Sequence, residues 1–321
     1  MSKTKDITKF SAEQLQEFLT SFDVVFCDID GVLWQQLSKP IEGASESLMT
    51  LQNMGKKIYL ITNNTTAIAD NYYKSVEHIR LNLSSDHIID TMKIMVWYLK
   101  KIGFRDEAHA IVSNRARKML TEAGIRLTEQ PKVSELDTTL TAKQVIDRPS
   151  VKAVIVDFDV HSNWSMMALA ISCLARKDVL YITGITDDGY PFSTKPPIKI
   201  LGPGPLINVI TSQSGRQPIP CGKPSQNLKD YILEECNVTN LQRCLFIGDT
   251  IKQDMKFASM CGCIKLFVET GCDTLEEAQK EDDSCPDYYL PSLGQLFSAI
   301  IIHNVSVAPT TKLIIEALIE N

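Results

Sequence analysis

The sequence has no long apolar run and no excess of positive charge. No stretch is long and apolar enough to span a membrane, and the polar residues 1–10 contain no apolar signal segment. The net charge is −6, whereas nonspecific nucleic-acid binding requires a basic surface. We therefore expect neither a membrane nor a nucleic acid as a partner.

The nine cysteines form no CxxC pair, and Cys261 and Cys263 are too close together for ordinary zinc spacing. Cys27, Cys221 and Cys244 lie in or beside apolar runs, where a reduced cysteine behaves as a small hydrophobic residue. Internal repeats and low-complexity segments are also absent. This cysteine usage favours a reducing compartment, and the predicted location is cytoplasmic.

The overall composition is that of an ordinary globular protein. The 321 residues are 44% hydrophobic and 22% charged, which suffices for one large or two moderate domains. Strand-like runs at Val24–Cys27 and Lys57–Ile61 alternate with helical patterns at 44–53, 67–78 and 90–101. This alternation predicts an α/β fold with a parallel sheet and right-handed crossovers.

The pattern changes after Gly103, and the first alternation resumes at about Ile219. Between them, further strands are expected at about 108–113, 153–158 and 179–183. We predict a discontinuous core made of residues 1–104 and 216–321, and an inserted α/β domain at 105–215.

Some segments receive more specific predictions. Gly184 to Pro205 is rich in Gly, Pro, Thr and Asp, so it is predicted to be mostly loop. Within it, Gly202–Gly204 is interpreted as the turn that returns from the insert to the core. A helix is expected over Gln253–Met260, and no role is assigned to the tail at 301–321.

Two acidic residues, Asp28 and Asp30, directly follow the first predicted strand. In an open α/β sheet, ligands bind beyond the carboxyl ends of the strands. Two carboxylates at one strand end repel each other unless a cation joins them, and Mg²⁺ prefers hard oxygen ligands. The pair therefore indicates a centre for metal-assisted chemistry.

Three more polar segments stand at predicted strand ends or tight turns. They are Thr62-Asn63-Asn64, Gly222-Lys223-Pro224-Ser225, and Gly248-Asp249-Thr250 with Asp254 five residues beyond Asp249. In phosphoryl transfer, one carboxylate attacks phosphorus and a second carboxyl moves a proton. A hydroxyl, backbone N–H groups and a lysine hold the phosphoryl oxygens. The segments together supply these groups.

Each motif alone admits another interpretation. A lone DxD is often a solvated turn, and glycosyltransferases use one to hold a metal. Thr62 alone could cap the next helix. The Gly222-Lys223 pair departs from a P-loop, because Gln217 and Pro224 stand where that motif has Gly and Ser/Thr. The combination of segments is what favours phosphoryl transfer.

The ordered set DxDGV, TNN, GKPS and GDxxxxD resembles the haloacid dehalogenase superfamily. The more specific resemblance, over about residues 11–298, is to its nitrophenylphosphatase, phosphoglycolate phosphatase and chronophin-like branch. It implies a Rossmann-like parallel-sheet core with an inserted α/β cap, and a possible homodimer through that cap. The implied activity is Mg²⁺-dependent hydrolysis of phosphate monoesters of small metabolites, through an aspartyl-phosphate intermediate.

The resemblance also implies roles for the acidic residues. Asp28 corresponds to the nucleophile and a metal ligand. Asp30 corresponds to the general acid and base, and adds its backbone carbonyl to the metal. Asp249 is implied to bind Mg²⁺, and Asp254 is implied to support the metal site without binding the ion directly.

Other residues are implied to contact the substrate. Thr62, Asn63 and Lys223 correspond to phosphate-binding residues. The cap selects substrates in this family, and Asp187 matches a cap loop whose usual asparagine is missing here. Two other functions stay open: a phosphoprotein phosphatase of the same fold, and a catalytically silent member that binds a partner. The complete acidic set argues against the silent member.

Overall fold

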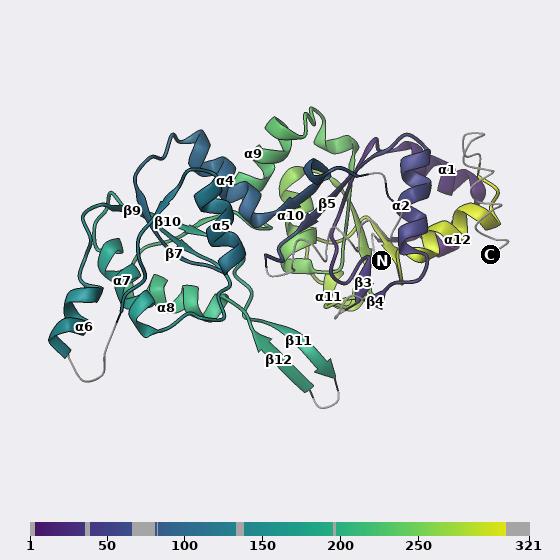
Figure 1. Cartoon of the computed structure of the whole chain (residues 1–321). Helices are drawn as coiled ribbons and strands as arrows, with labels where there is room; N and C mark the ends of the chain where they lie inside the picture. Colours follow the sequence, from purple (N-terminus) through teal and green to yellow (C-terminus); the bar gives the residue numbers. More distant parts are fainter. Residues whose placement is uncertain are drawn as a thin grey trace. The chain divides into compact units, whose positions relative to one another are not determined.

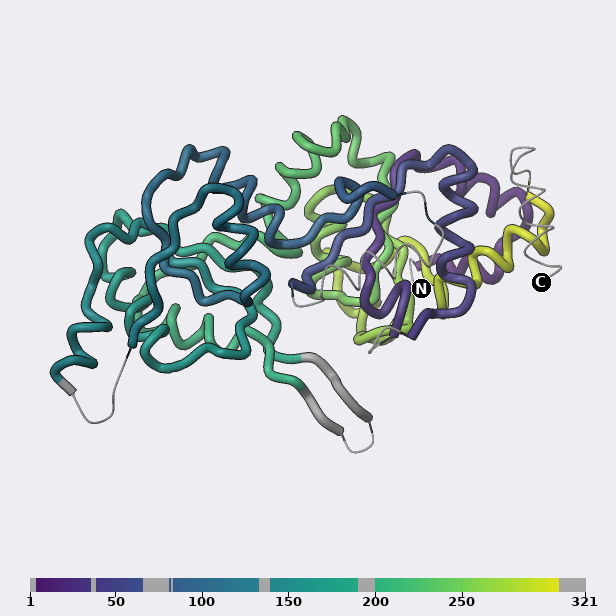
Figure 2. Tube along the Cα trace, in the orientation of Figure 1, coloured from purple at the N-terminus to yellow at the C-terminus, as the bar shows by residue number. Residues whose placement is uncertain are grey.

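The computed structural model divides the chain into two compact units (Figures 1 and 2). It describes residues 4–35, 39–65, 81, 83–132, 138–194 and 197–305. The first unit comprises Met1–Thr62, Ala69–Ile89 and Ile232–Asn321; the second comprises Asn63–Ile68 and Asp90–Tyr231. The second unit extends beyond 105–215 at both ends, and those domain boundaries stay a prediction.

A seven-stranded sheet forms the centre of the first unit, in the order β1-β16-β15-β14-β2-β5-β6. Its strands are β1 (Lys5–Asp6), β2 (Val24–Cys27), β5 (Lys57–Thr62), β6 (Ile88–Asp90), β14 (Cys244–Gly248), β15 (Ile264–Val268) and β16 (Tyr288–Leu290). The pairs from β1 across to β5 are all parallel. Ile247 pairs with Cys27, so β2 and β14 end side by side.

Helices and a short hairpin complete this unit. They are η1 (Ile7–Lys9), α1 (Ala12–Thr20), the β3–β4 pair (Trp34–Gln35 and Lys39–Pro40), α2 (Ala44–Asn53), η3 (Ser85–His87), η4 (Leu241–Arg243), η5 (Ile251–Met255), α10 (Lys256–Cys261), α11 (Leu275–Ala278) and α12 (Gly294–Ile302). Ser11 and Gln14 form the capping box that begins α1. Its buried residues, Leu15, Phe18 and Leu19, recur at helical spacing and face the core.

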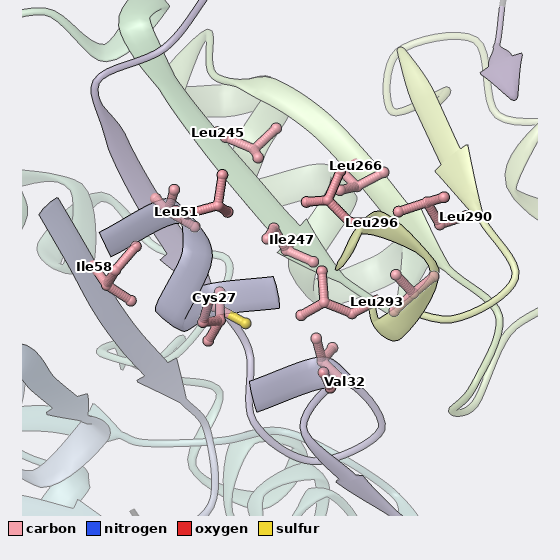
Figure 3. Packing of buried hydrophobic residues seen from close by; sticks show 14 of the residues in the cluster. Cys27, Val32, Leu51, Ile58, Leu245, Ile247, Leu266, Leu290, Leu293 and Leu296 are labelled. Carbon is pink, nitrogen blue, oxygen red and sulfur yellow. The ribbon is translucent and has the colours of Figure 1, made fainter. Parts of the chain in front are cut away.

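The core of the first unit lies between the sheet and its helices. Figure 3 shows Leu245 and Ile247 of β14 near Leu266 of β15, with Leu51 of α2 and Leu296 of α12 beside them. All of these side chains are fully buried. Burying a side chain of this size contributes about 1.5–3 kcal/mol. This packing holds the strand ends that carry Asp28 and Asp249.

The second unit contains a five-stranded parallel sheet in the order β13-β10-β9-β7-β8. Its strands are β7 (Glu107–Ile111), β8 (Arg126–Leu127), β9 (Val151–Val156), β10 (Leu180–Thr183) and β13 (Ile219–Pro220). Its helices are α4 (Thr91–Lys101), α5 (Asn114–Glu122), α6 (Thr138–Val145), α7 (Trp164–Leu174) and α8 (Gly204–Ser214); the unit division falls within α9 (Gln226–Glu235).

Helices α7 and α8 pack with the sheet of the second unit (Figure 1). Val154 and Val156 of β9 share a buried cluster with Leu169 of α7 and Ile207 of α8. Asn163 begins α7, because its side chain accepts hydrogen bonds from two first-turn N–H groups. The predicted α/β class with parallel sheets is therefore confirmed.

Two local predictions were wrong. The segment from Gly184 to Pro205 is not mostly loop: it contains the antiparallel pair β11 (Gly189–Thr194) and β12 (Pro197–Leu201), and α8 begins within it. Gly202–Gly204 does not return to the core, since it connects β12 to α8 within the second unit. The helix expected over Gln253–Met260 is confirmed, although its first part is the π-helical turn η5, which α10 follows directly.

Two further expectations lie outside the described residues: the helix at 67–78, and the tail beyond 305. Within the described part of the chain, no helix has the length and apolar character needed to cross a membrane.

Candidate active site

The first acidic residue of the site directly follows strand β2. Val25, Phe26 and Cys27 are fully buried, and the Asp28 N–H continues the pairing by donating to the Ile247 carbonyl at 2.9 Å. Asp28 is only 7% exposed. A charged carboxylate this deeply buried raises the free energy of the fold unless a cation or hydrogen-bond donors compensate it.

Asp28 is grouped with Asp249 and Asp254 in a cluster of three carboxylates. Each residue offers one oxygen, and these oxygens lie within 4.8 Å of one another. All three side chains are buried. Carboxylates this close repel each other, whereas a hard divalent cation such as Mg²⁺ is held by such oxygens. The residues present therefore fit a magnesium ion.

Asp254 holds the turn that contains Asp249. Its Oδ2 accepts hydrogen bonds from the N–H of Asp249 at 3.2 Å, and from the N–H and hydroxyl of Thr250 at 3.1 and 2.6 Å. The π-helical turn η5 places Asp254 there, and such turns often occur at functional sites. Gly248 leaves the necessary space, because a Cβ there would lie 2.3 Å from the Asp254 Cβ.

Asp30 lies outside this carboxylate cluster, and its side chain is exposed. The next residue, Gly31, has a φ of +86° and donates its N–H to the Trp34 carbonyl at 2.8 Å. The chain therefore turns sharply after Asp30. An exposed carboxyl two residues after Asp28 is accessible to exchange a proton with a substrate or with water.

Thr62 ends strand β5, next to β2 in the same sheet. Leu60 pairs with Cys27, so Thr62 lies at the same carboxyl edge as Asp28. Thr62 is 5% exposed. The first unit thus brings together four of the predicted residues at this edge: Asp28, Thr62, Asp249 and Asp254.

Asn63 and Lys223 belong to the second unit, where they contact each other. The Asn63 side chain donates to the Lys223 carbonyl at 3.0 Å and accepts from the Lys223 N–H at 2.8 Å. Both residues are less than a tenth exposed. A Cβ at Gly222 would come within 3.0 Å of the Asn63 Oδ1, so the glycine permits this approach.

Asp187 lies just before β11 in the second unit and is half-buried. Its carbonyl accepts a hydrogen bond from the Gly204 N–H at 2.8 Å, and a Cβ at Gly202 would clash with it at 2.1 Å. The main chain of Asp187 thus closes the base of the β11–β12 pair. Its predicted part in substrate selection stays a prediction.

A second acidic residue of this unit, Asp157, received no role from the sequence. It follows β9 and is 1% exposed. Burial raises the pKa of its carboxyl to about 7; the charge of Asp90 adds to this, and a hydrogen bond from the Phe158 N–H, at 2.8 Å, opposes it. A strongly shifted carboxyl of this kind gives the second unit a pH-dependent stability.

Sequence reasoning also missed the loop after β15, Thr270-Gly271-Cys272-Asp273. The Cys272 N–H donates to the Asp249 Oδ2 at 2.8 Å. Burial, followed by the charges of the surrounding carboxylates with Asp249 the foremost, raises the pKa of the Cys272 thiol to about 12. The loop contacts the cluster mainly through backbone N–H groups. Every residue except proline has such a group, so the sequence gives no signal of these contacts.

Comparison with known proteins supports the interpretation of the site. The family model "Haloacid dehalogenase-like hydrolase" matches residues 25–126, and the model "HAD-hydrolase-like" matches 220–296. The two matches include all the acidic residues of the carboxylate cluster, as well as Asp30 and Lys223.

Individual relatives are similar over most of the chain. A 4-nitrophenylphosphatase of Schizosaccharomyces pombe is 26% identical over 89% of this chain and 97% of its own. A chloroplastic phosphoglycolate phosphatase of Arabidopsis thaliana is 25% identical over 89% of this chain and 79% of its own. The resemblance to this branch is therefore confirmed.

The fold is also that of a solved phosphatase. A glycerol phosphate phosphatase from Mycobacterium tuberculosis, in complex with magnesium, has a TM-score of 0.69 at 18% identity, over 91% of this chain and 78% of its own. At this identity the likeness establishes the fold alone.

Proposed function

Since the chain belongs to the haloacid dehalogenase-like hydrolases and, like its relatives, is a phosphoric monoester hydrolase, we propose that it hydrolyses phosphate esters of small metabolites with the help of Mg²⁺. The carboxylate cluster of Asp28, Asp249 and Asp254 is the observation that supports this proposal most directly. A bound Mg²⁺ would offset the charge of the phosphate and of the carboxylates, and so stabilise the transition state.

Asp28 and Asp30 divide the covalent steps between them. An Asp28 carboxylate oxygen attacks phosphorus, and the bond from phosphorus to the ester oxygen breaks. Asp30 donates a proton to that leaving oxygen. Asp30 then accepts a proton from water, whose oxygen attacks the aspartyl-phosphate; this releases inorganic phosphate and restores the Asp28 carboxylate. The exposure of Asp30 supports its exchange of protons with both leaving group and water.

Thr62, Asn63 and Lys223 are proposed to hold the phosphoryl oxygens. The Thr62 hydroxyl and the Lys223 ammonium supply a donor and a positive charge. The Asn63 side-chain amide is already engaged with the Lys223 main chain, so we assign the phosphate contact of Asn63 to its backbone N–H.

The substrate class is set by analogy, because the matched relatives are named for different small esters. Asp187 is proposed to contact the part of the substrate that does not react. The nine cysteines all lie in the described ranges and form no disulfide, which supports the proposed cytoplasmic location. A homodimer through the second unit is also proposed, by resemblance alone.

An assay of the full chain with 4-nitrophenyl phosphate, with and without Mg²⁺, tests the reaction. Turnover that requires Mg²⁺ and is lost on chelation supports the proposal, whereas no turnover with saturating Mg²⁺ contradicts it and favours the silent member. A panel of phosphoglycolate, glycerol 3-phosphate and phosphopeptides then tests the substrate class. Preference for phosphopeptides would contradict the metabolite assignment and favour a phosphoprotein phosphatase.

A further inference from the structure

The loop Thr270-Gly271-Cys272-Asp273, hereafter the 270–273 loop, contacts both acidic turns of the first unit. The Thr270 hydroxyl donates to the Gly31 carbonyl at 2.5 Å, in the turn that follows Asp28 and Asp30. The Cys272 N–H donates to the Asp249 carboxylate at 2.8 Å. One short segment thus connects the nucleophile's turn to the second carboxylate of the cluster.

The same loop also supports the helical turn that contains Asp254. The Asp273 carboxylate accepts a hydrogen bond from the Ile251 N–H at 2.6 Å, at the start of η5. The Asp273 N–H donates to the Asp249 carbonyl at 3.3 Å. Asp249 is therefore held by this loop at its main chain and at its side chain.

Two glycines from different loops enclose the Asp249 carboxylate. A Cβ at Gly271 would lie 1.8 Å from the Asp249 Oδ2, and a Cβ at Gly31 would lie 2.5 Å from the same oxygen. Real Cβ atoms do not approach an oxygen this closely, so any side chain at Gly271 would displace the carboxylate or the loop. The carboxylate is thus fixed sterically as well as by hydrogen bonding.

We infer that the 270–273 loop is a positioning element that sets Asp249 against the turn of Asp28, an inference that rests on the proposed metal-dependent function. Mg²⁺ demands near-ideal octahedral geometry, so small errors in ligand position weaken its binding. Removing a group that hydrogen-bonds to a metal ligand typically weakens metal binding by 10- to 100-fold. Thr270 and Gly271 are positioning residues in this sense.

Variants of Thr270 and Gly271 test the inference through Mg²⁺ binding to the full chain. Thr270→Val removes the hydrogen bond to Gly31 and nearly keeps the shape, whereas Thr270→Ser keeps the hydroxyl. Thr274→Val is the matched control, because Thr274 caps α11 and bonds Glu277 instead of the acidic turns. Gly271→Ala displaces Asp249 directly.

Isothermal titration of Mg²⁺ without substrate gives the readout, with circular dichroism as the folding control. We expect Thr270→Val to weaken Mg²⁺ binding by about tenfold, Thr270→Ser to restore it, and Thr274→Val to bind as the parent does. Gly271→Ala is expected to weaken binding further. If a folded Thr270→Val variant binds Mg²⁺ with the affinity of the parent, the inference is overturned. The comparison of Thr270→Val with Thr270→Ser gives this answer even if Gly271→Ala does not fold.

The titration also separates this inference from the proposed activity. A parent chain that binds Mg²⁺ but hydrolyses no phosphate ester would contradict the proposed function, while the loop is still judged on binding alone. A parent chain that binds no Mg²⁺ would overturn the inference.

Discussion

The Asn63 side chain forms a two-way hydrogen-bonded pair with the main chain of Lys223, donating at 3.0 Å and accepting at 2.8 Å. Because both main-chain groups of Lys223 are engaged, the position of its backbone depends on a side chain far away in sequence. This relationship gives Asn63 a structural part that the sequence motif alone did not predict.

We expect Asn63→Ala to lower the free energy of unfolding and to raise KM, since it leaves two buried main-chain groups of Lys223 without these hydrogen bonds. Each unmade bond costs about 1–3 kcal/mol. Asn227→Ala is the control, because Asn227 makes one exposed bond, to the Pro220 carbonyl. Urea unfolding and steady-state kinetics measure both effects. Equal losses in the two variants would contradict the special position of Asn63.

For the nucleophile, Asp28→Asn is expected to reduce turnover by several orders of magnitude, since it keeps the shape but removes the attacking charge. Asp23→Asn is the matched control just before the same strand, where Asp23 pairs with Arg243 at the surface. It is expected to retain most of the activity. Turnover of 4-nitrophenyl phosphate is the measurement, and more than about a tenth of the parent rate in Asp28→Asn would exclude this role.

For the metal ligand, Asp249→Ala is expected to weaken both Mg²⁺ binding and activity. Ca²⁺ is expected to substitute poorly in the parent, because it takes more ligands at longer distances and disturbs in-line attack. Activity is measured across a series of Mg²⁺ and Ca²⁺ concentrations after chelation. Full activity of the chelated protein without added metal would refute the proposed mechanism.

The buried Asp157 predicts a pH dependence of stability. Its pKa is about 7 in the folded chain against an ordinary value of 3.8, so the folded state binds more protons between these values. Stability from this group is therefore highest below about pH 4, falls as pH rises to about 7, and then levels off. The full difference is about 4 kcal/mol at most.

Asp157→Asn is expected to remove this slope and to stabilise the chain at pH 8 relative to the parent. The asparagine oxygen can still accept from the Phe158 N–H. Urea unfolding at pH values from 5 to 8 compares the two chains, with Asp159→Asn as the control. Asp159 is more exposed, and its Oδ1 accepts a hydrogen bond from the His161 N–H. A parallel slope in parent and Asp157→Asn would mean that Asp157 ionises normally.

For substrate selection, Asp187→Ala is expected to change the ranking of natural phosphate esters and to leave 4-nitrophenyl phosphate nearly unaffected. Asp188→Ala is the neighbouring control, since its side chain is exposed. The measurement is kcat/KM for several esters. An equal loss of kcat/KM on every ester would mean that Asp187 supports the fold and does not select substrates. Ile185 is a poorer probe, because it is 2% exposed and an asparagine there would bury an amide.

The central strands could be predicted from the sequence because burial on both faces gives them continuous apolar runs. Strand β2 was predicted with its observed bounds, and β5 differs from the prediction only by Thr62. The β11–β12 pair was missed, since Pro191 and Pro197 look like loop residues although prolines are tolerated at strand edges and starts.

The acidic residues of the site were foreseen from their positions after strands, whereas their supports were not. The 270–273 loop acts through N–H groups and through the absence of a side chain at Gly271, neither of which forms a recognisable pattern. The π-helical geometry of η5 could likewise not be predicted from the sequence, because it depends on the hydrogen bonds between Thr250 and Asp254.

The pairing of Ile247 with Cys27 has a consequence for folding. Asp28 and Asp249 are more than two hundred positions apart in the sequence. They therefore come together only when the distant strands β2 and β14 have paired, and such long-range pairing is slow. Their mutual repulsion then opposes the closing of the sheet, and a cation that binds only the closed sheet relieves it. Magnesium present at a hundred times its dissociation constant would stabilise the native chain by about 2.7 kcal/mol. The ion would then be a folding ligand before it takes part in any reaction.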